Sequence, residues 1–352
     1  MEKKLIKMPS IEQFASTVQT ILRRVNFVGF DENGDAIYDP SIPKPTITFT
    51  GTVKAHGTNA SVAYNNHDGM WCQSKAKIIT PEQDNAGFAF FVESKKECFE
   101  EIIKDISMNN DIDLNENTIT VYGEWCGGNI QKNVAINGLD KMFLLFGIKV
   151  TPFDTEETSY WIDSKGYEYF PDETRIYNIE NFGTFKVDVD LNNPKMSQNK
   201  IHDLTEFVED ECPIGKYFGI SGTGEGIVWV AEYNGDRYRF KSKGEKHAGK
   251  SKVKTIKKVD NERLQLIIDT ADKVTPVWRL EQMLEETCDF MNGGEMDRSK
   301  LGDFIRLVIN DIMKEDLHII NDAGLEPKDI NKRVSEVARM YFFEQEKERV
   351  GL

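Results

Sequence analysis

Residues 46–64 read TITFTGTVKAHGTNASVAY, and this stretch sets the pattern for the first part of the chain. The β-branched run Thr46–Val53 predicts a strand, and Ala60–Tyr64 predicts a second strand close behind it. Lys54 stands at the end of the first strand, where its side chain can be directed into a cleft. Gly57 permits a tight turn and a close approach of its backbone to a ligand.

The six residues Lys54–Asn59 carry polar groups that can serve chemistry. Asn59 offers both hydrogen-bond donors and an acceptor. A Lys-x-x-Gly pattern is nevertheless common, and taken alone it is more typical of a lysine on a surface hairpin than of a reactive one.

More strands and two helices are predicted around this stretch. Met70–Gln73 completes a hairpin with Ala60–Tyr64 across the turn Asn66–Gly69. A capping box of Ser10 and Gln13 predicts a helix through about Arg24. The other predicted elements are a loop or small hairpin over Asp31–Pro45, a helix over Gly87–Ser107, and strands over Thr118–Glu124, Met142–Val150, Gly226–Glu232 and Arg237–Lys241.

After Asp260 the periodicity becomes helical. Apolar residues recur at helical spacing from Val277 to Met291 and from Leu301 to Ile312, and Pro327 opens a third such pattern. We therefore expect an α+β protein with two domains, residues 1–258 with the strands and residues 259–352 all helical. The segment Asp154–Lys200 fits no predicted element and is expected to be a family-variable insertion.

Four further segments supply what a transfer of a nucleotide to Lys54 requires. Glu124 ends a predicted strand, Phe146 lies within an apolar one, and Glu225 follows a glycine-rich turn. Lys241 and Lys243 alternate, so both point to one face. An amine that attacks an ATP α-phosphate needs a purine platform, carboxylates for a metal and the ribose, and cations for the developing charge. Because a free lysine has a pKa near 10.4, neighbouring cations would help by disfavouring its charged form.

These motifs, in this order, resemble those of the covalent nucleotidyltransferase superfamily, which includes DNA ligases, RNA ligases and mRNA capping enzymes. The sequence Lys54-Ala55-His56-Gly57-Thr58-Asn59 is most similar to the nucleophile motif of the phage RNA ligase 2 family, Lys-x-His-Gly-Thr-Asn. Tyr122-Gly123-Glu124-Trp125 and the following 129–134 resemble the family's next motif. The resemblance covers about residues 45–258. It implies an ATP-grasp-like antiparallel sheet followed by a helical C-terminal domain.

The resemblance implies roles in binding ATP. Lys54 would become lysyl-AMP, and the backbone of Thr52 and Val53 would read the adenine edge. Phe146 would stack on adenine, and Glu124 would hold a ribose hydroxyl.

It also implies roles at the phosphates. Asn59 would lie beside the AMP ribose and phosphate, and Glu225 would serve a divalent metal, Mg²⁺ or Mn²⁺. Lys241 and Lys243 would bind the α-phosphate and orient the leaving pyrophosphate. His56, which replaces the aspartate of DNA ligases, would act on the polynucleotide end.

Two positions depart from the family pattern. Lys75 replaces an arginine that would engage the 5′-phosphate or AMP, and a lysine cannot make a bidentate phosphate contact. Gly147 replaces an aspartate that often follows the stacking phenylalanine, so that polar contact is lost or supplied elsewhere.

The remaining polar and aromatic residues suggest simpler roles. His67, His202, His247 and His318 are isolated in the sequence and are expected to be surface or packing residues. Trp71, Trp161 and Trp229 are expected to be core or half-buried aromatics.

Composition limits the classes of function. The net charge of −15 argues against a general nucleic-acid coat protein, but ten basic residues against one acidic residue between Arg237 and Lys258 favour a local phosphate-binding surface or a solvated basic loop. Five widely spaced cysteines without a Cys-x-x-Cys pair predict neither a disulfide framework nor a zinc site. No membrane-spanning run or secretory signal is seen, so a cytoplasmic protein is expected, in the host cytoplasm if it is viral.

Together these features predict an ATP-dependent RNA ligase that acts as a monomer on RNA ends, with nicked duplex RNA as substrate. Two alternatives stay open. A DNA ligase or capping enzyme would share the first step, although those usually append a β-barrel domain. An inactive nucleic-acid-binding descendant would not need all of Lys54, Glu124, Glu225, Lys241 and Lys243.

Overall fold

The computed structural model describes residues 3–154, 158–167, 172–248 and 255–350. By contacts between Cα atoms the chain forms two compact units. Unit 1 consists of Met1–Thr17, Thr48–Asp188 and Lys200–Lys257, and unit 2 of Val18–Ile47, Val189–Asn199 and Lys258–Leu352. The helical segment expected after residue 258 lies in unit 2, but two earlier segments group with it. A domain boundary between residues 258 and 259 stays a prediction.

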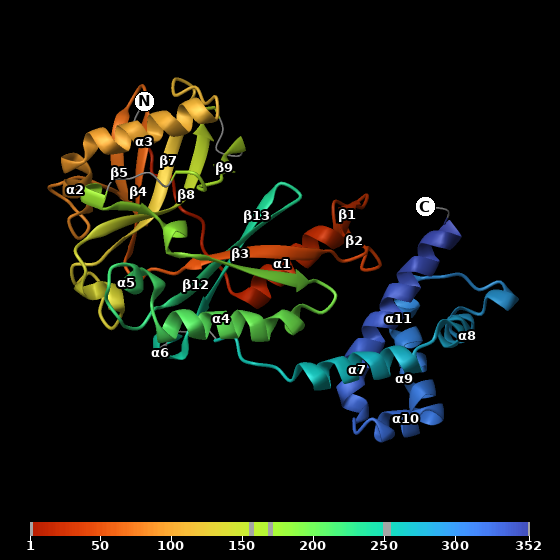
Figure 1. The fold of residues 1–352 in the computed structure, drawn as a ribbon. Coiled ribbons are helices and arrows are strands. Elements are labelled where there is room, and N and C mark those ends of the chain that lie inside the picture. The colour runs from red at the N-terminus through yellow and green to blue at the C-terminus, as the bar shows by residue number, and fades with distance from the viewer. Residues whose placement is uncertain (1–2, 155–157, 168–171, 249–254, 351–352) are drawn as a thin grey trace. The chain divides into compact units, whose positions relative to one another are not determined.

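A seven-stranded sheet forms the larger layer of unit 1 (Figure 1), in the order β10-β8-β7-β4-β5-β6 with β9 also paired to β8. Its strands are β4 (Thr58–Asn65), β5 (Gly69–Ser74), β6 (Ile78–Ile79), β7 (Asn117–Cys126), β8 (Met142–Pro152), β9 (Tyr160–Ile162) and β10 (Ile176–Asn178). An antiparallel sheet is expected. The sheet departs from this at one edge, because β10 pairs with β8 in parallel. The predicted hairpin at residues 60–73 is confirmed by the register of β4 with β5.

Two helices cover one face of this sheet, and Figure 1 shows α3 lying across it. α2 (Phe88–Ser94) and α3 (Lys96–Asn109) replace the single helix expected over 87–107. The break falls at Lys95, whose φ of −121° is not helical. Phe88 of α2 and Phe99 of α3 pack with Val121 and Phe143 in the main core, so each helix turns its apolar side to the strands.

A four-stranded sheet forms the second layer, in the order β11-β3-β12-β13. Its strands are β11 (Thr184–Asp190), β3 (Thr46–Val53), β12 (Gly226–Tyr233) and β13 (Asp236–Lys243). Phe49, Trp229 and Phe240 are fully buried on one face, where Phe14 joins them with a ring-centroid distance of 5.1 Å to Phe240. The opposite face carries the alternate residues, Lys241 and Lys243 among them.

The first helix begins later than the capping box predicts. α1 spans Phe14–Asn26 rather than starting at Ser10. The backbone of Glu12 bonds instead to β13, with its nitrogen donating to the Arg239 carbonyl at 3.3 Å and its carbonyl accepting from Lys241 at 3.1 Å. Those bonds use the groups that a helix would need, so the prediction of the helix start is wrong.

The segment Asp154–Lys200 belongs to the fold rather than standing outside it. It supplies β9 and β10 to one sheet and β11 to the other. β9 and β10 have three residues each, which is too short for a clear alternation in the sequence. β11 does alternate, with Phe185, Val187 and Val189 between polar residues, and sequence reasoning missed it. Other helices of this part are α4 (Gln198–Asp210), α5 (Pro213–Tyr217) and α6 (Glu245–Ala248).

Unit 2 is built mainly from helices, as predicted for the C-terminal part. They are α7 (Asn261–Val274), α8 (Val277–Cys288), α9 (Leu301–Glu315), α10 (Leu317–Asp322) and α11 (Pro327–Val350). Phe304, Val308 and Phe342 are fully buried in their shared core. The N-terminal part of this unit holds the small hairpin of β1 (Phe27–Phe30) and β2 (Ala36–Tyr38), which confirms the expectation for 31–45.

Candidate functional site

The turn after β3 is fixed by backbone contacts that only a glycine allows. The Lys54 nitrogen donates to the Gly226 carbonyl at 2.8 Å, which continues the pairing of β3 with β12. A Cβ at Gly57 would lie 2.3 Å from the Trp125 carbonyl oxygen and 2.7 Å from the Cys126 Cβ. The Gly57 backbone therefore lies directly against β7, and Lys54 and His56 leave the turn on the side of Glu225.

Glu225 is the centre of the site. Its Oε2 accepts from the Lys54 Nζ at 2.6 Å and lies 3.0 Å from the His56 Nδ1, while its Oε1 lies 2.6 Å from the Lys243 Nζ. The Glu225 side chain is 1% exposed, whereas those of its three partners are 19–27% exposed. One buried carboxylate thus gathers three side chains that remain open to an incoming ligand.

The pKa of Glu225 reflects this surrounding. Burial alone would raise it, but the hydrogen bond from His56, the charge of Lys54 and the hydrogen bonds from Lys243 and Lys54 outweigh burial. The pKa lies well below its ordinary value, so the carboxylate stays ionised near neutral pH.

Glu124 lies on the other side of the turn, and its pKa is shifted in the opposite direction to that of Glu225. Its Oε1 accepts from the Gly57 backbone nitrogen at 3.0 Å. Burial raises its pKa to about 7, with a further contribution from the charge of Glu225, against the lowering effects of Lys54, the Gly57 hydrogen bond and His56. Glu124 faces Asn59 across the β4–β7 ladder, so the two side chains share one face of the sheet.

The lysines at the end of β13 add positive charge. Burial lowers the pKa of Lys241, and the charges of Lys243, Lys54 and Lys75 lower it further, against the effect of Glu225. Lys75 follows β5 and is exposed. Lys241 therefore lies within electrostatic reach of three other lysines, and such grouped positive charge suits an anion.

Phe146 occupies an irregular position in the sheet. The β7–β8 register moves from Tyr122 opposite Gly147 to Gly123 opposite Leu145, so Phe146 has no partner across the ladder. Such a bulge turns a side chain away from regular alternation. Phe146 is half-buried and packs against the buried cluster of Ile6, Ala63, Trp71 and Tyr122.

Trp161 packs closely over Gly147. A Cβ at Gly147 would lie 3.2 Å from the Trp161 ring. The guanidinium groups of Arg239 and Arg237 lie 4.5 and 5.0 Å from the ring centre of Trp161. Beside Gly147 the structure therefore has a tryptophan that packs against two arginines.

Thr52 and Val53 are the last two residues of β3. Val53 is buried opposite Ile227, and Thr52 is half-buried opposite Val228. Their proposed contact with adenine stays a prediction.

His247, expected to be isolated, lies beside the site. Its ring centre is 5.7 Å from that of His56. Burial lowers its pKa, and the charges of His56 and Lys243 add to that effect, while Glu225 and Glu209 oppose it. Sequence reasoning missed this residue because α6, which carries it, is only four residues long. Gln131 also reaches the turn, since its Nε2 donates to the Gly57 carbonyl at 3.3 Å.

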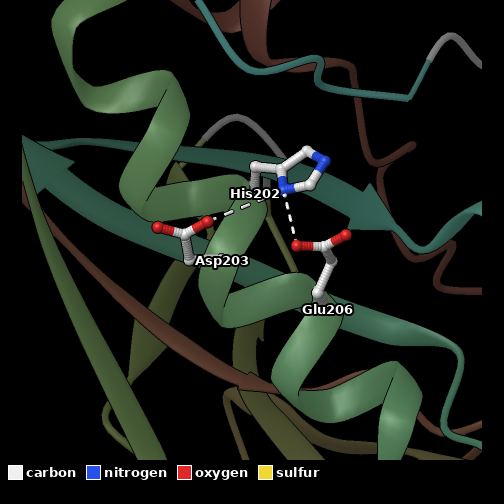
Figure 2. A group of neighbouring side chains, drawn as sticks. All are labelled: His202, Asp203 and Glu206. Carbon is white, nitrogen blue, oxygen red and sulfur yellow. Dashed lines mark ion pairs between the residues drawn. The ribbon is translucent and has the colours of Figure 1, made fainter.

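A second group of polar side chains lies on α4, where His202, Asp203 and Glu206 come together (Figure 2). The His202 Nδ1 is 3.1 Å from Glu206 and 3.8 Å from Asp203. The carboxylates are exposed and one helical turn apart, so an ion pair along the helix accounts for the group.

Part of the predicted basic segment cannot be placed. Lys250, Lys252 and Lys254 lie outside the described residues. Within the described residues we find no helix with the length and apolar character to span a bilayer.

Comparison with family models identifies an RNA ligase. Residues 47–243, more than half of the chain, match the family model for RNA ligase. The chain also resembles solved structures of an RNA ligase from Naegleria gruberi, one with PPi and variants with AMP and Mn and with ATP and Mn. The structure with PPi has a TM-score of 0.43 and 16% identity over 71% of this chain and 59% of that one, so this chain spans less than two thirds of its relative. No curated protein matches the chain.

The matched range contains the turn at Lys54, both glutamates and the two lysines of β13. It ends at Lys243, which is also the last residue of β13 and a partner of Glu225. The family match therefore coincides with the part of the chain that builds the site. The chain belongs to the RNA ligase family.

Proposed function

We propose that this protein is an ATP-dependent RNA ligase of the phage RNA ligase 2 type, which works through an adenylated Lys54. The Lys54 amine attacks the α-phosphorus of ATP, a P–N bond forms, and the bond to pyrophosphate breaks. An RNA 5′-phosphate oxygen then displaces the lysine, and an RNA 3′-hydroxyl finally displaces AMP to form the phosphodiester bond.

One observation carries this proposal. Glu225 holds Lys54 and Lys243 at 2.6 Å and His56 at 3.0 Å around one buried carboxylate. A lysine on an ordinary surface hairpin is not held by a buried carboxylate in this way, and a purely structural ion pair does not need three partners that each keep 19–27% of the side chain exposed. The arrangement holds the nucleophile beside cations that can stabilise negative charge on phosphate.

The nucleotide would lie against the turn on its Glu124 side. Glu124 and Asn59 face each other across two strands, so both can contact the ribose and the phosphate of one AMP. The half-buried ring of Phe146 would stack on the adenine base, and the backbone at Thr52 and Val53 would read the edge of that base.

The phosphates would lie toward β13. Lys241 and Lys243 point to one face of that strand, and the charges of Lys243 and Lys75 act on Lys241. Positive charges grouped in this way favour a polyphosphate and help pyrophosphate to leave.

Glu225 could bind a divalent metal only if phosphate oxygens of the substrate supplied further ligands. Mg²⁺ and Mn²⁺ prefer oxygen ligands and often take one or two carboxylates together with phosphates. Glu225 is ionised, but both its oxygens already have partners. Conversion of Lys54 to a phosphoramidate removes its positive charge and would leave His56 as the remaining partner of the Glu225 Oε2, so that a metal could join it there. Bound there, a metal would neutralise phosphate charge.

His56 is assigned to the later steps because it shares Glu225 with Lys54 but is more exposed, 27% against 19%. We further propose that residues 1–258 carry the adenylylation chemistry and that residues 259–352 help to engage the polynucleotide. RNA ends, chiefly in nicked duplex, would be the substrate of a monomeric protein acting in the cytoplasm, which is the host cytoplasm if the protein is viral.

The proposal is tested with the whole chain, α-labelled ATP and Mg²⁺ or Mn²⁺. Nicked duplexes with a 5′-phosphate in RNA and in DNA are offered in parallel. We expect labelled protein, transfer of the label to the RNA 5′-phosphate, and sealing of the RNA nick. Sealing of the DNA nick alone would point to a DNA ligase instead, and a protein that takes up no label would refute the proposal.

A further inference from the structure

A pocket lies on unit 1 next to the site and is not part of it. Its volume is about 240 Å³. That is below the range of pockets for drug-sized ligands, roughly 300–1,000 Å³, so it suits a group such as one nucleobase. The pocket is lined by Leu139, Asp140, Met142, Arg175, Tyr177 and Phe218.

The aromatic wall of this pocket is part of a larger group of rings. Phe218 lies 5.3 Å from Tyr177 and 4.9 Å from Tyr217, measured between ring centres. Tyr177 is buried, whereas Phe218 is half-buried at the end of α5. An open ring backed by other rings is a firm platform on which a planar base can stack.

A charged pair stands at the edge of the pocket. The Arg175 guanidinium lies 2.8 Å from the Asp140 carboxylate, and the two side chains are 45% and 78% exposed. An exposed ion pair of this kind adds little to stability. It does hold a planar guanidinium at the rim, where it can contact a phosphate or a base.

The backbone at Arg175 is strained. Its φ is +57°, in the left-handed region that favours glycine or asparagine. The Arg175 carbonyl accepts from the Phe143 nitrogen at 3.0 Å, and the next residues pair with β8. The fold thus holds an arginine in a conformation that arginine does not favour, which is typical of residues kept for a ligand.

The pocket adjoins the adenylylation site along one pair of strands. Met142 lies opposite Cys126 in the β7–β8 ladder, two residues beyond Glu124. Alternation puts Glu124 and Cys126 on the same face of the sheet, about 7 Å apart along the strand. That separation is comparable to the length of one nucleotide.

We propose that this pocket binds a single nucleobase of the RNA substrate, one that is unpaired or frayed close to the junction. The base stacks on Phe218, and Arg175 contacts the phosphate that flanks it. This assignment rests on the proposed function, because it takes the ligand to be the RNA that is sealed. It adds a contact that orients the RNA end without any part in forming lysyl-AMP.

The test measures binding of RNA directly, so that it does not depend on sealing. Nicked RNA duplexes carry the fluorescent base 2-aminopurine at successive positions on either side of the nick. With the wild-type protein we expect quenching at one position, because stacking on an aromatic ring quenches this base. Phe218→Leu, which keeps the apolar volume but removes the ring, should abolish that quenching, and Phe218→Tyr should restore it.

A second arm uses sealing and an abasic nucleotide in place of 2-aminopurine. The abasic nucleotide at that same position should raise the KM for RNA with wild-type protein by about 5- to 150-fold, the loss expected for one base–aromatic stack. With Phe218→Leu the abasic and normal RNA should have nearly equal KM values, since the contact is already gone. Arg175→Asn, which suits the left-handed backbone, should raise the KM for both RNAs.

Two controls separate this proposal from others. Lysyl-AMP formation should be unchanged in each variant, which also shows that the variants fold. Phe207→Ala removes an aromatic side chain that is 59% exposed and outside the pocket, and it should leave quenching and KM unchanged. Equal quenching by wild type and Phe218→Leu at every position would overturn the pocket assignment while leaving the proposed function intact. If the wild-type protein forms no lysyl-AMP, the proposed function is refuted. The quenching pattern would still decide whether the pocket binds a base.

Discussion

Two glutamates on either side of one turn have pKa values shifted in opposite directions. Glu225 is held ionised by three partners, whereas burial raises the pKa of Glu124 to about 7. Residues of one type with pKa values moved in opposite directions are typical of sites that handle charge. At the scale of single residues, the site is therefore defined by its electrostatics as much as by its motifs.

The raised pKa of Glu124 predicts a pH effect on stability. Its folded-state pKa of about 7 exceeds the ordinary value of 4.5, so the folded state binds more protons between these values. Stability is then lost as pH rises from about 5 to 7, and the ionised group opposes folding above that range. Glu124→Gln should be more stable than wild type at pH 8 by about 1–2 kcal/mol, and much less so at pH 5. Urea unfolding at both pH values measures this, and an equal difference at the two would contradict it.

His56 is predicted to act after the first step. His56→Ala should still form lysyl-AMP, because Glu225 keeps Lys54 and Lys243 in place. Transfer of AMP to the RNA 5′-phosphate or the joining of strands should fall by about 10²–10⁴-fold, the usual contribution of a positioned acid or base. Lys75→Ala should show the same pattern more weakly. Pre-adenylated RNA, which bypasses the first two steps, separates the affected step, and equal loss in lysyl-AMP formation and sealing would instead make His56 a structural brace.

At the scale of elements, the meeting of β3, β4, β7, β12 and β13 builds the site. The Gly57 backbone lies against β7 of the larger sheet. The Gly226 carbonyl accepts from the Lys54 nitrogen and extends the pairing of β3 with β12 in the smaller sheet, so the two sheets approach each other at this turn. The bulge at Phe146 is the other irregular feature of these strands. Irregular backbone is concentrated where the nucleotide is proposed to bind.

Phe146, which lies at the bulge, is predicted to stack on adenine. Phe146→Ala should raise the KM for ATP in self-adenylation by about 5- to 150-fold, since base–aromatic stacking is worth about 1–3 kcal/mol. Phe146→Leu keeps an apolar platform and should be milder. Rates of lysyl-AMP formation across a range of ATP concentrations give the KM, and normal adenylation of Phe146→Ala at low ATP would show that Phe146 is a core residue only.

Strong local patterns could be predicted from the sequence, and contacts distant in sequence could not. The strand before Lys54 and the hairpin after it are long and alternate clearly, so their prediction is confirmed. The start of α1 is decided by bonds from Glu12 to β13, more than two hundred residues away, and no local pattern reveals them. The same holds for His247, which meets His56 only in the folded chain.

At the scale of the whole molecule, charge distinguishes the parts of the chain. Residues 259–352 contain 21 acidic and 13 basic residues. Several of the basic ones are paired within unit 2, as Arg263 is with Asp329, Arg298 with Glu346 and Arg333 with Asp272. A broad cationic surface for RNA is therefore not expected from these helices, and any contact they make with a polynucleotide has to be local.

Truncation tests whether residues 1–258 carry adenylylation and residues 259–352 help to bind RNA. A chain of residues 1–258 should still form lysyl-AMP, because every proposed ATP-binding residue lies within it. Sealing of nicked RNA should fall, with the KM for RNA more affected than adenylylation. The truncation also removes Lys347, which pairs with Asp39 in unit 2, so lysyl-AMP formation serves as the check on folding. A truncated chain that seals as well as the whole one would leave the helical part without its proposed role.

The covalent adduct on Lys54 tests the central claim most directly. The protein is incubated with α-labelled ATP and a divalent metal, digested, and the modified peptide is identified by mass spectrometry. We expect one AMP on Lys54 through a bond that acid breaks and alkali does not, as a phosphoramidate behaves. Lys54→Ala should carry no label, while Lys75→Ala, which removes a lysine near the site but not the nucleophile, should still be labelled. Label on another residue, or label that survives Lys54→Ala, would contradict the account.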